Sequence, residues 1–391
     1  MKRISRTVWI LSLVSFFTDL ASEMLYPVMP IYLKEIGFSI LLIGILEGIA
    51  EAVAGLSKGY FGKLSDQYAR RLPFIKSGYS LSAISKPMLA LSTIPIWVFF
   101  ARTIDRIGKG IRTGARDALL SDEATPASKG QIFGLHRAMD TLGAVIGPMV
   151  AIWFLGKFPH QYTTLFYLAF IPGVLAVASL FILKEKKRSV QPPTKKIKLL
   201  SFLSYWNESP GTYRKLVIGL LAFAVINSSD VFLLLKMKDE GFTDTHVIGI
   251  YIFYNLVYAV AAFPLGVAGD RIGLKKVLIG GIFLFGIVYS GMSMAKSQST
   301  FLILFALYGI YAAATEGISK AWISNVVKPS DTATAIGTYT GLQSICALIA
   351  SSFAGLLWYK LGATSLFLFS GIGALGIILY FFTVPEMPNK K

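Results

Sequence analysis

Charged side chains concentrate in one short stretch, RTIDRIGKGIRTGARD at 102–117, which holds five basic and two acidic residues. The stretch directly follows the apolar segment PIWVFFA at 95–101. Its charged residues repeat at spacings of three and four, so a helix would carry them along one side. Side chains that ionise at membrane depth are costly, and by default they mark a path for a substrate or an ion.

Depth divides this stripe into two groups. A helix rises about 1.5 Å per residue, so a span that begins near residue 95 places Arg106 near mid-membrane and Arg116 near the inner boundary. We expect the deep bases to serve coupling or substrate binding; they are Arg102, Arg106 and Lys109. We expect the inner group to belong to a cytoplasmic gate; it comprises Arg112, Arg116 and Asp117.

Composition places the helix that carries this stripe in a membrane protein. The chain is 54% hydrophobic and 15% charged, with a mean hydropathy of +0.62, which is too apolar for a soluble domain. The net charge of +17 lies mostly in short segments between apolar runs. The positive-inside bias accounts for that pattern, so we expect no nucleic-acid partner. The lone Cys346 excludes an internal disulfide and is expected to be a packing residue.

The apolar runs predict twelve spanning helices, the first of them a retained helix rather than a signal peptide. An even number of spans, with Lys and Arg concentrated on the side of the termini, places both termini in the cytoplasm. A basic, Pro-interrupted linker is predicted at 185–213. It separates an N-terminal six-helix bundle at 1–184 from a C-terminal six-helix bundle at 214–391. Within it, LLSFLSYW at 199–206 is expected to form a short helix on the membrane surface. The predicted spans are 7–33, 40–64, 73–93, 95–121, 128–156, 162–184, 214–236, 244–268, 274–295, 300–324, 332–359 and 364–384.

The two halves repeat each other. LKEIGF at 33–38 matches MKDEGF at 237–242, and Asp66 and Asp270 stand at the same offset of 204 residues. Two six-helix halves in parallel repeat indicate a secondary transporter whose substrate path runs between them.

The segments around these aspartates are similar to the G-x-x-x-D-x-x-G-R-[KR] signature of the major facilitator superfamily. The first half has Gly62, Asp66, Arg70 and Arg71, with Ala69 where Gly is usual; the second has Gly266, Asp270, Arg271, Gly273, Lys275 and Lys276. The resemblance implies an all-α membrane fold of twelve transmembrane helices in two six-helix bundles related by pseudo-two-fold symmetry. It also implies a cytoplasmic latch in which each Asp caps a neighbouring helix and pairs with basic residues. The alternative for Arg70 and Arg71 is a turn that only fixes topology.

Two further segments resemble motifs of the same family. GAVIGPMVA resembles the G-x-x-x-G-P motif of drug–proton antiporters, which implies a hinge at Gly143, Gly147 and Pro148. Arg106 and Gly110 fit the R-x-x-x-G spacing that the family associates with proton coupling.

The first span supplies carboxylates on one face, with Asp19 near the midplane and Glu23 one turn later. The resemblance implies that spans 1, 4, 7 and 10 line a central cavity, so this face is expected to meet the stripe of span 4. Burial favours the neutral form of a carboxyl group and a nearby base favours its charged form; a group balanced between them carries a proton. We favour that role for Asp19 or Glu23 over a permanent salt-bridge network.

Other polar residues at membrane depth are weaker candidates. Glu51 lies near the middle of span 2, and Arg137 and Asp140 either pair within span 5 or act in transport. The candidates in the second half are Asn227, Asp230, Glu316 and Lys320.

These features predict a proton-coupled exporter of a small organic, anionic or amphipathic molecule that works by alternating access. The alternatives are a proton-coupled importer of a small metabolite or siderophore-like anion, and a lipid-handling carrier. An enzyme is disfavoured because the sequence holds three His and shows no metal-ligand cluster, nucleophile motif or phosphate loop. We expect no cofactor and no metal, and a monomer in the bacterial inner membrane whose partners are substrate, protons and lipid.

Overall fold

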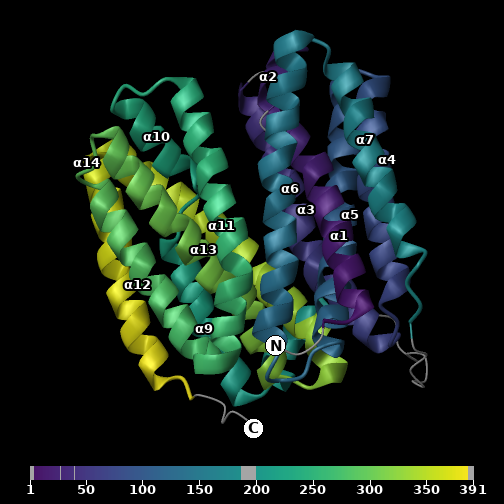
Figure 1. The fold of residues 1–391 in the computed structure, drawn as a ribbon, viewed down its shortest axis with the longest axis vertical. Coiled ribbons are helices and arrows are strands. Elements are labelled where there is room, and N and C mark those ends of the chain that lie inside the picture. The colour runs from purple at the N-terminus through teal and green to yellow at the C-terminus, as the bar shows by residue number, and fades with distance from the viewer. Residues whose placement is uncertain (1–3, 27, 39, 186–199, 386–391) are drawn as a thin grey trace. The chain divides into compact units, whose positions relative to one another are not determined.

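Each span predicted from hydropathy overlaps one or two helices of the computed structural model, which describes residues 4–26, 28–38, 40–185 and 200–385 (Figure 1). The first half consists of α1 (Arg6–Leu25), α2 (Met29–Glu35), α3 (Ile40–Gln67), α4 (Leu72–Leu91), α5 (Pro95–Asp122), α6 (Lys129–Lys157) and α7 (Tyr162–Leu180). The short helices η1 (Ser201–Ser204) and α8 (Tyr205–Glu208) follow the linker. The second half consists of α9 (Gly211–Ile226), α10 (Val231–Asp239), α11 (Asp244–Ile272), α12 (Leu274–Met292), α13 (Gln298–Val326), η2 (Pro329–Asp331) and α14 (Thr332–Thr383).

Eight helical stretches among the described residues are long and apolar enough on their own to cross a membrane. The α5 helix is not one of them, because its charged stripe interrupts the apolar run. The last stretch contains two predicted spans, which run together in α14 and are separated by a non-helical residue, Gly362, at φ +81°. Only glycine adopts that left-handed conformation without steric cost.

The first span of each half is a broken helix. Span 1 divides between α1 and α2, and span 7 divides between α9 and α10 at Asn227–Asp230. The second break follows from the polar run NSSD, whose side chains compete for backbone hydrogen bonds. Because the two breaks lie at nearly the same place in each half, the internal repeat extends to backbone geometry. Discontinuous helices of this kind place polar backbone groups where transporters bind substrates and ions.

The chain forms two compact units, each with its own core. Unit 1 comprises Met1–Glu123, Met139–Glu208 and Lys328–Gly341. In it, α5 packs against both α3 and α4, while α7 packs against α1 and α4 (Figure 1). Gly78 of α4 and Gly108 of α5 lie so close that a Cβ on either would stand 2.6 Å from the carbonyl oxygen of the other. These glycines allow α5 to bring its charged stripe against α4.

Unit 2 comprises Ala124–Ala138, Ser209–Val327 and Leu342–Lys391. Its centre is α13, which packs against α11 and α12. Gly309 of α13 lies close to the α11 backbone, where a Cβ would stand 2.8 Å from the carbonyl oxygen of Tyr254. The core of this unit is rich in buried aromatic rings, among them Phe285, Tyr289 and Phe367.

Two helices run from one unit into the other. Residues 129–138 of α6 belong to unit 2 and the rest of that helix to unit 1. Conversely, residues 332–341 of α14 belong to unit 1 and the rest to unit 2. Each unit therefore contains the start of a helix from the other half of the sequence. The bundle boundaries at 184 and 214 stay a prediction, and residues 186–199 of the basic linker lie outside the described residues.

The end of the linker is anchored on protein. Phe202 of η1 is 2% exposed, and its ring occupies the space that a Cβ on Gly59 would need. The Lys63 ammonium of α3 donates to the carbonyl oxygen of Ser201 at 2.6 Å. Burial raises the pKa of the Tyr205 phenol, and the carboxylate of Asp331 acts in the same direction. The helix expected at 199–206 is therefore present as η1 and α8, with Phe202 and Tyr205 buried in unit 1.

Phe202→Ala is expected to destabilise the protein by about 3–5 kcal/mol, since it deletes a fully buried ring. Leu203→Ala is the matched control, because Leu203 neighbours Phe202 in η1 but is 39% exposed. Thermal unfolding of the two variants in detergent measures the difference. Equal melting temperatures for both would show that η1 is not anchored through Phe202.

Candidate functional site

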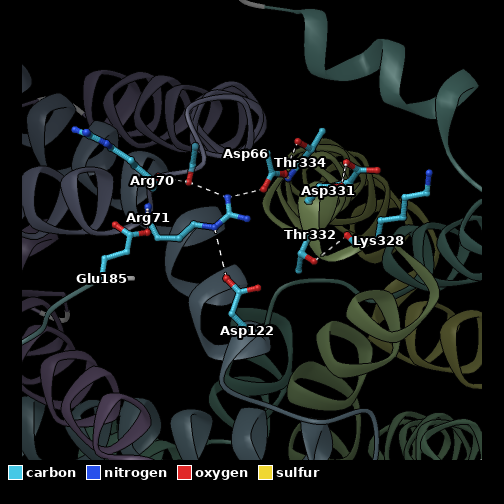
Figure 2. Close-up of polar contacts among 11 residues, drawn as sticks. Asp66, Arg70, Arg71, Asp122, Glu185, Lys328, Asp331, Thr332 and Thr334 are labelled. Carbon is cyan, nitrogen blue, oxygen red and sulfur yellow. Dashed lines mark hydrogen bonds and ion pairs between the residues drawn. The ribbon is translucent and has the colours of Figure 1, made fainter. Parts of the chain in front are cut away.

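Asp66, in the last turn of α3, caps the start of α14 within unit 1. One of its carboxylate oxygens accepts hydrogen bonds from the backbone N–H and the hydroxyl of Thr334, each at 2.6 Å. A carboxylate at this position satisfies N–H groups that the first turn of a helix leaves unpaired and interacts favourably with the helix dipole. Figure 2 shows this contact beside the ion pair of Asp66 with Arg71.

Arg71 holds Asp66 in place. Its side chain is 1% exposed and lies 2.5 Å from Asp66 and 3.8 Å from Asp122, at the end of α5. Its guanidinium also donates to the Ser65 hydroxyl at 3.1 Å. The backbone N–H of Arg71 donates to Glu185, which follows α7. Arg71 therefore joins α3, α5 and the end of α7 around the cap on α14.

Arg70 is placed differently. Its side chain is exposed and extends away from Asp66 in Figure 2, while its carbonyl oxygen accepts from Ser65 at 3.0 Å. The preceding Ala69 has φ +49°, and its counterpart in the second half, Gly273, has φ +106°. The position at which the signature usually has Gly thus requires positive φ in both halves.

The second half repeats the cap in unit 2. The carboxylate oxygens of Asp270 accept from the backbone N–H groups of Gly130 at 2.7 Å and Gln131 at 2.6 Å, at the start of α6. Arg271 beside it is exposed. Asp66 and Asp270 therefore make the same kind of contact, each with the start of a helix that runs between the units.

Buried bases line α5 and the facing side of α4 in unit 1. Arg102, Arg112 and Arg116 are 7%, 5% and 8% exposed, whereas Lys109 is exposed. Lys86 of α4 is 3% exposed and pairs with Asp105 at 2.7 Å. Arg116 pairs with its neighbour Asp117 at 2.9 Å.

Arg112 lies among these buried bases. Its guanidinium donates to the Ser82 hydroxyl at 2.5 Å and lies 4.4 Å from the centroid of the Tyr79 ring, both on α4. Its Nε–H has no hydrogen-bond partner within the described residues. A buried cation with an unused donor suits an anionic group. The sequence had assigned Arg112 to the cytoplasmic gate, and that role stays a prediction.

The carboxylates of α1 lie near bases of α5. Asp19 and Glu23 are both within electrostatic range of Lys109, and Glu23 is also near Arg106. The side chain of Asp19 also lies within interaction range of Asp140 of α6. The side chain of Glu51, the candidate in α3, lies outside the described residues.

The glycines of α6 bring that helix against α1. A Cβ on Gly143 would overlap the carbonyl oxygen of Phe16, and one on Gly147 would stand 2.7 Å from that of Leu20. The α6 helix continues through Pro148. The glycines thus serve close packing of α1 and α6, and a hinge at Pro148 stays a prediction.

A carboxylate surrounded by tyrosines forms the polar centre of unit 2. Asp230, at the break between α9 and α10, accepts from the hydroxyls of Tyr308 at 2.6 Å and Tyr254 at 3.2 Å. Asn227 at the same break donates to the Tyr311 hydroxyl at 2.9 Å. Asn227 and Asp230 were both sequence candidates, whereas these tyrosines were not.

The remaining candidates of unit 2 lie on α13. The carboxylate of Glu316 pairs with Arg137, in the part of α6 that belongs to this unit. The Arg137 guanidinium also lies 5.9 Å from the ring centroid of Tyr258. Lys320 is partly exposed one turn after Glu316.

Broken helices, internal repetition and paired helix caps define the chain as a membrane transporter. A family model described as Major Facilitator Superfamily matches residues 11–253 and 216–391. The uncharacterized MFS-type transporter MJ1317 of Methanocaldococcus jannaschii is 32% identical over 388 residues, which cover 97% of this chain and 96% of the relative. The chain therefore belongs to the Major Facilitator Superfamily, as a multi-pass integral membrane transporter and not an enzyme.

More distant proteins share the fold. The multidrug resistance protein MdtH of Photorhabdus laumondii is 22% identical over 80% of this chain and 76% of its own. The crystal structure of the human organic anion transporter MFSD10 (TETRAN) superposes with a TM-score of 0.81 at 17% identity, covering 97% of this chain and 100% of that one. The E. coli fucose:proton symporter FucP superposes with a TM-score of 0.73 at 13% identity, covering 97% and 98%.

Proposed function

We propose that this transporter exports a small organic anion, or an amphipathic molecule with an anionic group, in exchange for protons. It works by alternating access as a monomer in the cytoplasmic membrane of a bacterium, with both termini in the cytoplasm. The observation that carries the proposal is the group of buried bases on α4 and α5, which includes Arg112 with its unused donor.

The charge balance of this region supports an anionic substrate. Lys86 is paired with Asp105 and Arg116 with Asp117, whereas the buried guanidinium of Arg112 keeps an Nε–H without a hydrogen-bond partner among the described residues. A buried charge is costly unless a negative group pairs with it. A substrate anion at Arg112 supplies that partner while it is bound.

Proton coupling is supported by the carboxylates that face these bases. Glu23 and Asp19 lie near Lys109, so the protonation of these carboxylates and the occupancy of the site beside them influence each other. In the proposed exchange, protons that enter from outside neutralise one of these carboxylates. The substrate displaces that proton or competes with it, so the two are carried in opposite directions.

Export rather than import is supported by two weaker observations. The G-x-x-x-G-P motif on α6 resembles that of drug–proton antiporters, and proteins named for multidrug resistance are 22–23% identical to this chain. The named activity of FucP, fucose:proton symport, represents the alternative on the same fold. Asp66 on Thr334 and Asp270 on Gly130 are proposed to be the latch that opens and closes during either cycle.

Inside-out proteoliposomes with an acidic lumen test the proposal. An exporter of this kind accumulates the anionic dye sulforhodamine B in the lumen, and a protonophore prevents it. An importer instead releases preloaded dye when the lumen is acidic. Gradient-independent movement, or transport of the cation ethidium alone, would contradict the proposal.

Arg112→Gln is expected to reduce this dye accumulation at least about tenfold, which corresponds to about 1.4 kcal/mol. Charge-assisted hydrogen bonds are worth about 1.5–3 kcal/mol, so loss of one accounts for that factor. Arg112→Lys is the matched variant, because it keeps the charge and is expected to retain more transport. If Arg112→Gln matches the unmodified protein, Arg112 does not bind the anion.

A further inference from the structure

The carboxyl groups of Asp19 on α1 and Asp140 on α6 lie within interaction range of each other. An ionised carboxylate only accepts hydrogen bonds, so these two groups can form a hydrogen bond only while one of them holds a proton. The Ser15 hydroxyl, one turn before Asp19, donates to the Oδ1 atom of Asp140 and so stabilises the negative charge that remains. The arrangement suits a pair that holds one proton and one negative charge.

The backbone keeps this pair together. Gly143 follows Asp140 by one turn of α6. A Cβ on Gly143 would overlap the Phe16 carbonyl and lie 3.2 Å from the Cβ of Asp19. Any larger residue than glycine would separate α1 from α6 at this level. Asp140 itself is 8% exposed. The proximity of the two carboxyl groups is thus built into the helix contact.

Charged groups of α1 and α5 lie near the pair. Within electrostatic range are Glu23 of α1, Lys109 of α5 near Asp19, and Arg116 of α5 near Asp140. Further groups close to these are Tyr79 and Lys86 of α4 and Arg106 of α5. On α6 itself, His136 precedes Asp140 by one turn. The pair therefore lies between a cluster of bases and one further carboxylate.

We propose that Asp19 and Asp140 form a single proton-carrying site that holds one proton between them, and that Glu23 lies outside this site. The inference rests on the proposed proton-coupled function and names the site of the coupling proton. Two carboxyl groups this close share a proton because both cannot easily be ionised together, and they titrate as a unit. Deprotonation breaks the O–H bond, transfers the proton to water and leaves two carboxylates facing the bases of α5.

The position of Asp140 connects this site to a cytoplasmic cap. Asp140 lies two residues after the segment of α6 that belongs to unit 2. The start of that segment is held by Asp270, and its Arg137 pairs with Glu316. Release of that segment acts on the same helix that carries Asp140. Movement of α6 away from α1 separates the two carboxyl groups, and each then ionises independently. Proton release is thereby linked to opening of the cap.

Infrared difference spectra of the purified full-length protein, recorded between neutral and alkaline pH, test this inference, because ordinary carboxyl groups are already ionised at neutral pH. Protonated carboxyl groups have a separate carbonyl stretch. The protein is expected to show a band from one protonated carboxyl that Asp19→Asn, Asp140→Asn and the double variant all remove to the same extent, since the carboxyl group that remains in a single variant is ionised at neutral pH beside the bases of α5. Glu23→Gln is the matched control, since Glu23 faces the same bases from α1, and it is expected to leave this band in place.

Several outcomes would overturn the shared site. These are a band that survives Asp140→Asn, separate bands lost one by one in the two single variants, and loss of the band in Glu23→Gln. If an Asn variant does not fold, Ser15→Ala keeps both carboxyl groups and removes one hydrogen bond. It is expected to shift the frequency of the band at constant amplitude, and an unchanged spectrum counts against the pair. The measurement needs no transported molecule, so its result is independent of the dye assay.

Discussion

Arg71→Ala is expected to reduce proton-driven transport at least about tenfold and to lower thermal stability, whereas Arg70→Ala is expected to leave both nearly unchanged. The signature contains both residues, but only Arg71 is buried against the Asp66 carboxylate. Removing one partner of a buried ion pair costs about 3–5 kcal/mol, because the other charge stays buried and uncompensated. Without Arg71 the negative charge of the Asp66 carboxylate is no longer stabilised. Its hydrogen bond with the Thr334 N–H weakens, and the start of α14 loses its cap.

Comparing Arg71→Ala with Arg70→Ala distinguishes a role in the latch from a role in membrane topology. Both variants remove one positive charge from the same loop, so a change in topology through the positive-inside bias would affect them alike. Dye accumulation in proteoliposomes and melting temperature in detergent are the two measurements. An equal loss of transport and stability in both variants would support the alternative that the loop only fixes topology. Full transport activity of Arg71→Ala would exclude the latch.

The fold was predictable because it depends on local and periodic signals. Apolar runs located the spans, and the offset between Asp66 and Asp270 revealed two halves that the structure repeats in their helix caps. Even the departure at Ala69 is interpretable, since this residue adopts the positive φ that Gly273 adopts in the second half. These features are encoded within short segments, and sequence spacing is sufficient to detect them.

The candidate site was less predictable because it depends on which helix faces which. Spacing along one helix made Arg137 a possible partner of Asp140, but the structure also pairs Arg137 with Glu316 on α13 and brings Asp140 to Asp19 on α1. Sequence periodicity shows which residues share a face of a helix, but not which helix that face contacts. Tyr254 and Tyr308 were missed for another reason: aromatic residues in an apolar helix resemble ordinary core until a carboxylate such as Asp230 is found beside them.

The sequence also gives no local sign that the first residues of α6 belong to unit 2 and those of α14 to unit 1. This arrangement depends on glycines that let backbones touch, and a GxxxG pattern is common in membrane helices. In unit 2 the contact is between Gly130 and Gly134 of α6 and Gly266 of α11. In unit 1 the counterpart is formed by Gly62 of α3 and Ala333 of α14. The first glycine of the signature, Gly62 or Gly266, is thus the one that each cap needs for close approach.

Gly266→Ala is therefore expected to abolish proton-driven transport with little loss of expression. A Cβ there would overlap the Gly130 carbonyl oxygen and lie 2.9 Å from its carbon and 3.1 Å from the Cα of Gly134. All three atoms belong to the backbone, so no side-chain rotation relieves the overlap, and overpacking of this kind costs about 1–3 kcal/mol. The start of α6 must move away from α11, and Asp270 then loses the N–H groups of Gly130 and Gln131.

Gly280→Ala in α12 is the matched control, because nothing lies within 4 Å of a Cβ at that position. Movement of α6 is measured with Ser128→Cys in a Cys346→Ser background, since Ser128 precedes α6 and is 5% exposed. A membrane-impermeant maleimide is expected to label this cysteine faster in Gly266→Ala than in Gly280→Ala. Unchanged labelling together with normal transport in Gly266→Ala would show that this backbone contact is not part of the transport cycle.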